Sequence, residues 1–173
     1  MKTHSLTALA TILALAAGPV LAETETFSGL DVKVDLSDYQ NSNALVYWPD
    51  LEHDLMLAIM EHSNIDKEAD VPKISVTVNN VAVDGDTVLP DSGEFNQLTG
   101  TVQVFRGNGA MSVGASSQSS PDDLLRNYFI KVTAVTGDVA VPDGWVLVPP
   151  SQDKFYTAMV DAFAMEVVDR YDN

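Results

Sequence analysis

Residues 31–36 and 73–83 alternate apolar and polar side chains with a period of two, which is typical of β-strands with one buried face. In the second segment the alternation slips by one position at residues 79–80, both asparagine, so a β-bulge is predicted there. The Asp-Gly pair at 84–85 favours the tight turn of a two-residue hairpin. The sequence therefore predicts two strands, the second with a bulge and a hairpin turn at its end.

The second half of the chain contains further short apolar segments that are separated by turn residues. An Asn-Gly pair at 108–109 is a second hairpin signal. A brief helix is expected after the Ser-Pro pair at 120–121, because serine and proline suit the first positions of a helix. The predicted strands are residues 98–105, 110–113, 128–135, 139–141 and 145–148.

Two longer segments, residues 51–64 and 151–171, contain neither glycine nor proline. Their apolar residues recur at the spacing of an amphipathic α-helix, although Leu57 falls on the polar side of the first. The polar sides carry Asp54 and Glu61 in the first helix, and Lys154, Thr157 and Asp161 in the second. The apolar sides carry Leu51, Leu55, Ala58, Ile59 and Ile65, and Phe155, Met159, Ala162 and Phe163.

The order of these elements and the tight turns between them predict an α+β fold. We expect an antiparallel β-meander of about five to six strands with two α-helices packed on one face. The other face would then carry polar residues, and we interpret it as a solvent-exposed surface, with a docking face for a partner as the alternative. Its expected residues are Asp31, Lys33, Asp35, Ser75, Thr77, Thr99, Thr101, Gln103, Lys131 and Thr133.

Residues 1–22 have the three parts of a secretory signal peptide. Lys2 supplies a positive start, residues 6–17 are mostly apolar, and Val20-Leu21-Ala22 is a small-residue cleavage site. The apolar run is shorter than the roughly 20 residues that a membrane-spanning helix needs, so no membrane insertion is expected. We therefore predict a cleaved signal peptide followed by a single α+β domain at residues 23–173.

Charge and cysteine content exclude several classes of function. The 173 residues include 25 acidic and 9 basic side chains, which gives a net charge of −16. Such a surface repels nucleic acid and anionic lipid, so neither is an expected partner. The chain has no cysteine, which excludes disulfides, thiolate metal sites and thiol catalysis.

No catalytic residue is assigned from the sequence. His53 and His62 are the histidines beyond the signal peptide, and their spacing of nine places them on opposite sides of a helix. Neither has the second histidine four residues away that a zinc-binding helix needs. Ser112 lacks the glycine spacing of a hydrolase nucleophile, and no phosphate-binding glycine motif occurs.

A turn-rich segment contains the densest acidic cluster outside the helices. Its carboxylates are Asp84, Asp86, Asp91 and Glu94. Closely spaced carboxylates on a loop can supply oxygen ligands to Ca²⁺, although the positions do not match an EF-hand loop. We interpret the segment as a turn, with a calcium site as the alternative and no other cofactor expected.

Three aromatic residues are candidates for contact with a partner: Tyr47, Trp48 and Trp145. Large aromatic side chains usually belong to the core, but tyrosine and tryptophan also anchor interfaces when they are partly exposed. The degree of burial distinguishes these two roles.

The sequence therefore favours an exported, soluble periplasmic protein that binds a protein or small ligand without catalysis, or that serves as an accessory module of the envelope. One alternative is a small hydrolase that uses carboxylates, which a pocket with two facing carboxylates of raised pKa would favour. The other is a calcium-stabilised module. An exposed apolar patch near Trp48 would favour the binding protein.

We expect signal peptidase to cleave after Ala22, because Val20 and Ala22 are the small residues that its site requires. The intact mass of the exported protein should then correspond to a chain that begins at Glu23. Recovery of a species with residues 1–22 attached, in the membrane fraction, would contradict the prediction.

Overall fold

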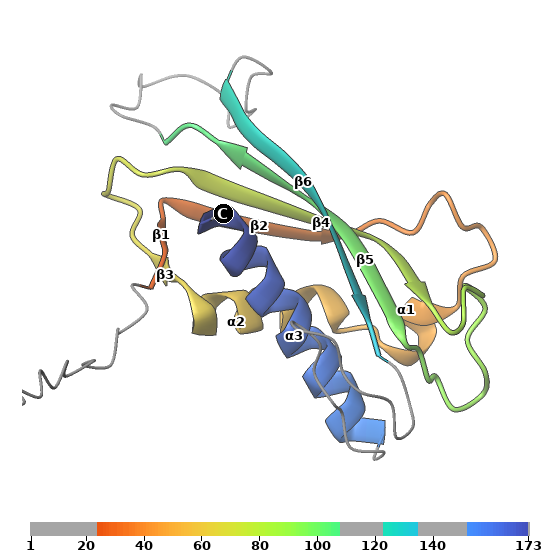
Figure 1. Cartoon of the computed structure of the whole chain (residues 1–173). Coiled ribbons are helices and arrows are strands. Elements are labelled where there is room, and N and C mark those ends of the chain that lie inside the picture. The colour runs from red at the N-terminus through yellow and green to blue at the C-terminus, as the bar shows by residue number, and fades with distance from the viewer. Residues whose placement is uncertain (1–23, 108–122, 135–151, 173) are drawn as a thin grey trace, which may run out of the picture.

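The computed structural model describes residues 24–107, 123–134 and 152–172 (Figure 1). In the described part a twisted four-stranded sheet has two longer helices on one face. The elements are β1 (Thr26–Phe27), β2 (Gly29–Val34), α1 (Ala44–Tyr47), α2 (Leu51–His62), β3 (Asn64–Ile65), β4 (Lys73–Ala82), β5 (Gln97–Phe105), β6 (Leu124–Thr133) and α3 (Gln152–Asp172).

The sheet has the strand order β2-β4-β5-β6 and is not the predicted meander of five to six antiparallel strands. Strands β4, β5 and β6 are antiparallel neighbours, but β2 pairs with β4 in parallel. The cause is α2, which lies between β2 and β4 in sequence and returns the chain to the end of the sheet where β2 began. Strands predicted at 110–113, 139–141 and 145–148 lie outside the described residues.

Several local predictions are confirmed. The fold mixes helices and strands as expected, and both long helices lie within two residues of their predicted bounds. The register between β4 and β5 shifts between Val78 and Asn80, where the bulge was predicted. Asp84 and Gly85 have φ angles of 49° and 90°, which the turn of a two-residue hairpin requires.

Three short elements were not predicted from the sequence. The two-residue strands β1 and β3 pair in parallel beside the main sheet, and α1 has only one turn. Such elements are too short to give a periodic pattern. The brief helix expected after 120–121 lies mostly outside the described residues; Asp123 is its one described residue, it has 3₁₀-helical conformation, and β6 begins at Leu124.

The core lies between the sheet and the layer of α2 and α3. The apolar sides of the helices face the alternate apolar residues of β4 and β5, and Leu55, Ile59 and Phe163 are fully buried there. Leu57 is 46% exposed, as its position on the polar side of α2 predicts. No helix in the described part of the chain is long and apolar enough to cross a membrane.

Gly100 in β5 allows α3 to approach the sheet closely. A Cβ atom at this position would lie 2.8 Å from the Phe163 ring and 2.8 Å from the Thr77 carbonyl oxygen. Contacts this short are repulsive, and the carbonyl belongs to a strand that cannot move without breaking the ladder. Glycine is therefore required here for packing and not for an unusual φ angle.

We predict that Gly100→Ala lowers the free energy of unfolding by about 1–3 kcal/mol, the usual cost of inserting atoms into a packed core. Thr101→Ala, one residue along on the other face of the sheet, should cost less than about 1 kcal/mol. Urea denaturation of both variants measures the difference. Equal midpoints for the two variants would contradict the role given to Gly100.

Candidate functional site

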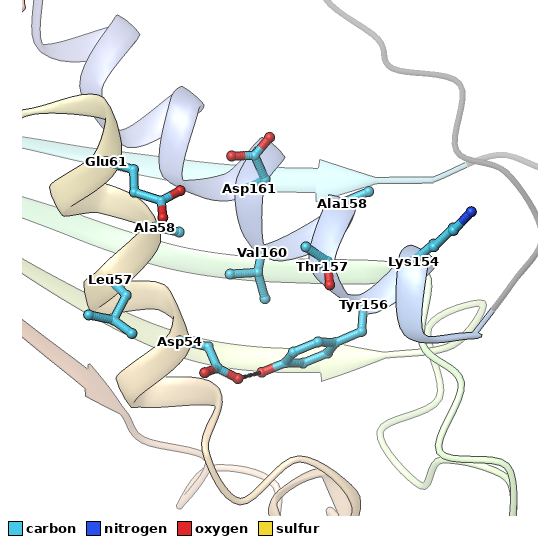
Figure 2. Close-up of a pocket in the computed structure, with 10 residues that line it drawn as sticks. All are labelled: Asp54, Leu57, Ala58, Glu61, Lys154, Tyr156, Thr157, Ala158, Val160 and Asp161. Carbon is cyan, nitrogen blue, oxygen red and sulfur yellow. Dashed lines mark hydrogen bonds between the residues drawn. The ribbon is translucent and has the colours of Figure 1, made fainter.

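A groove of about 780 Å³ lies between α2 and α3 on the side of the helices away from the core (Figure 2). Both helices contribute to its walls. Its lining residues are Asp54, Leu57, Ala58, Glu61, Lys154, Tyr156, Thr157, Ala158, Val160 and Asp161. The candidate site is therefore formed by two segments that are about 100 residues apart in the sequence.

The groove is acidic because the polar sides of the two helices meet at it. On α2, Asp54 and Glu61 are seven residues apart, which places both on one side of the helix about 10 Å from each other. On α3, Lys154 and Asp161 have the same spacing. The lining thus includes three carboxylates and one ammonium group, together with small and apolar residues.

Hydrogen bonds join the helices near both ends of the groove. At one end the Tyr156 hydroxyl donates to Asp54 Oδ2 at 2.6 Å, as Figure 2 shows. Farther along, His62 Nε2 lies 2.7 Å from Asp161 Oδ1, and these side chains are 32% and 49% exposed. Two of the three carboxylates therefore also hold α2 and α3 together.

Burial raises the pKa of the Tyr156 hydroxyl well above its ordinary value, and the hydrogen bond to the Asp54 carboxylate raises it further. Both effects favour the neutral phenol, because ionisation would place a second negative charge beside Asp54. The hydroxyl therefore stays protonated and remains a hydrogen-bond donor at neutral pH.

The predicted partner residue Trp48 packs beside the groove. Its ring stacks on Tyr156 with centroids 4.1 Å apart, and its Nε1 donates to the Gly93 carbonyl oxygen at 2.7 Å. Phe95 meets both rings edge to face. Trp48 is partly buried, so it positions Tyr156 and the wall of the groove.

Tyr47 packs on the turn at Gly93, where its ring atoms fill the space that a side chain would need. The two residues before it, Leu45 and Val46, are 42% and 78% exposed. A contact with a partner near Tyr47 and Trp48 stays a prediction, and Trp145 lies outside the described residues.

The four acidic residues considered as an alternative calcium site lie in or near the hairpin turn after β4. Asp84 Oδ1 accepts from Asn96 Nδ2 at 2.7 Å, and Asp86 Oδ1 accepts from the Val88 amide at 2.9 Å. Asp91 and Glu94 are exposed. Within residues 24–107, 123–134 and 152–172, no three His, Asp or Glu side chains are grouped to hold a metal.

The histidines lie at different places on α2. His53 is exposed in its first turn, whereas His62 is the last residue of the helix and contacts α3. The contact with Asp161 was not predicted, because sequence spacing within one helix does not show which second helix packs against it.

Comparison with known proteins does not assign the chain to a family. No protein-family model matches the sequence, and no curated protein matches it at a significant level. The functional argument therefore depends on the groove and on the surfaces of the described fold.

We predict that Tyr156→Phe lowers stability at neutral pH by about 1 kcal/mol through loss of the hydrogen bond to Asp54. The folded pKa of Tyr156 is raised, so its contribution is complete below the unfolded value of 10.0 and is lost as pH rises above it. The difference in unfolding free energy between the wild type and the variant should therefore shrink above pH 10.

Urea denaturation from pH 7 to 11 measures this difference. Burial also raises the pKa of Tyr128, but this residue is present in both proteins, so its contribution cancels in the difference. Tyr39→Phe, at a 39% exposed tyrosine, serves as the matched control. A constant difference between wild type and Tyr156→Phe across this range would contradict the prediction.

Proposed function

We propose that the protein is an exported, soluble periplasmic binding module, and that the groove between α2 and α3 binds an extended organic cation. The observation that carries this proposal is the lining of the groove, where three carboxylates outnumber one ammonium group in a recess shared by two helices. The net charge of −16 adds a long-range attraction for cations.

The shape of the charge distribution favours a long ligand over a compact ion. Asp54 and Glu61 are about 10 Å apart along α2, and the apolar residues Leu57, Ala58 and Val160 lie between the charged positions. A chain of methylene groups with ammonium groups spaced along it matches both features. Polyamines have this structure.

The alternative function, a carboxylate-dependent hydrolase, could use the same groove, because carboxylates from both helices line it. A carboxyl group that acts as general acid near neutral pH needs a desolvated site. The Asp161 side chain is 49% exposed and pairs with His62, and Asp54 accepts from Tyr156. Two of the three carboxylates thus have roles in joining the helices, which supports binding over hydrolysis.

A calcium-stabilised module gains less support than cation binding in the groove. Asp86 accepts a hydrogen bond from the Val88 amide within its own turn, and Asp84 accepts one from the Asn96 side chain just before β5. These bonds and the positive φ of Asp84 explain these two acidic residues through local geometry.

The test is isothermal titration calorimetry with spermine, and Glu61→Gln is the informative variant. Glu61 is exposed, and within the described residues its carboxylate has no hydrogen-bond or ion-pair partner, so the substitution should leave the fold intact. Loss of one exposed charge pair should weaken spermine binding about two- to fivefold. Glu68→Gln removes the same charge outside the groove and should change the affinity less.

Equal weakening by Glu61→Gln and Glu68→Gln would show that only net charge attracts the ligand and would reject the groove as its site. Absence of heat with the wild-type protein at low ionic strength, where surface attraction is strongest, would reject the proposed ligand class. Hydrolysis of a substrate that Glu61→Gln abolishes would favour the hydrolase instead.

A further inference from the structure

On the face of the sheet opposite the helices, carboxylates are confined to the edge strand β2, where Asp31 Oδ2 lies 3.5 Å from Ser75 Oγ of β4. Strands β4, β5 and β6 contain no aspartate or glutamate, although the chain has 25 acidic residues. Their open face carries mainly serine, threonine, asparagine and glutamine, with Lys73 and Lys131 near its borders. No helix of the described part covers this face in Figure 1.

Phe129 is an exposed aromatic residue within this carboxylate-free surface of β4, β5 and β6. Its side chain belongs to the open face because Ile130, next in the strand, is fully buried on the helix side, and Phe129 is 53% exposed. Thr101 is its cross-strand partner in β5, and Asn127 and Lys131 flank it along β6. An apolar ring is thus surrounded by side chains that both donate and accept hydrogen bonds.

We propose that the open face of β4, β5 and β6 binds an uncharged polysaccharide. A sugar ring has an apolar face of C–H groups that can stack on Phe129, and its rim of hydroxyl groups both donates and accepts. Thr101, Gln103 and Asn127 offer the complementary groups in one neighbourhood of the sheet. Open strand faces are known to bind oligosaccharides in other folds.

The charge of the protein argues against charged linear polymers as ligands of this face. Nucleic acids and acidic polysaccharides are repelled by a chain of net charge −16. A basic polymer would be drawn to the carboxylates of the helix layer and not to strands that have none. A surface without carboxylates therefore favours an uncharged polymer.

A second copy of the protein is a poorer match. Three strands of this length cover about 400 Å² at the usual strand spacing and rise, about half of the area per partner in a stable interface. Two copies would also bring together molecules of equal negative charge. This site is separate from the groove between α2 and α3, so the inference does not rest on the cation-binding proposal.

The test is retention of the full exported chain on insoluble cellulose and chitin, which are neutral β-1,4-linked polysaccharides. We expect retention that persists in 0.5 M NaCl, because no ion pair is involved. Phe129→Ala should reduce retention about three- to tenfold, whereas Phe129→Tyr, which keeps the ring, should preserve it. Leu57→Ala, at a residue of the groove with 46% exposure, should have no effect.

Melting temperatures of the variants confirm that each one folds, and an exposed side chain such as Phe129 should change them little. The proposal is overturned by retention no greater than that of an unrelated acidic protein, by loss of retention in salt, or by equal retention of wild type and Phe129→Ala. A stable dimer through this face that Phe129→Ala dissociates would also overturn it and would assign the face to self-association.

Discussion

The close packing of α3 on the sheet is the contact on which the rest of the described structure depends. Gly100 removes the side chain that would separate β5 from Phe163, and this allows the helix to bury its apolar side. The chain has no cysteine, so burial of apolar surface must stabilise the fold without disulfides. The position of α3 then fixes the groove, because α3 forms one of its walls.

Polar contacts determine how α2 lies against α3. The bonds from Tyr156 to Asp54 and between His62 and Asp161 join the helices outside the core, where water competes for each group. Trp48 stacks on Tyr156 and is held in turn by the Gly93 carbonyl oxygen. The loop before β5 therefore contributes to the shape of a groove that it does not line.

Local features could be predicted from the sequence, but the relation between distant segments could not. Residue periodicity located α2, α3 and most of β4, and the Asp-Gly pair at 84–85 identified its turn because φ angles there are a local property. The parallel pairing of β2 with β4 depends on the path of α2, which periodicity does not encode. The groove could not be predicted either, because the sequence shows the polar sides of the two helices only as separate solvent-exposed faces. Their packing against each other brings these faces together.

Carboxylates are unevenly distributed between the helix layer and the three strands β4, β5 and β6. Carboxylates gather where the polar sides of α2 and α3 meet, while β4, β5 and β6 have none. Carboxylates on either side of the molecule would serve solubility, so solubility alone does not explain why these three neighbouring strands contain none. A polar face without carboxylates also lacks the charge repulsion that keeps acidic surfaces apart. Contact with a neutral partner is therefore least opposed on the sheet side, and contact with a cation is most favoured on the helix side.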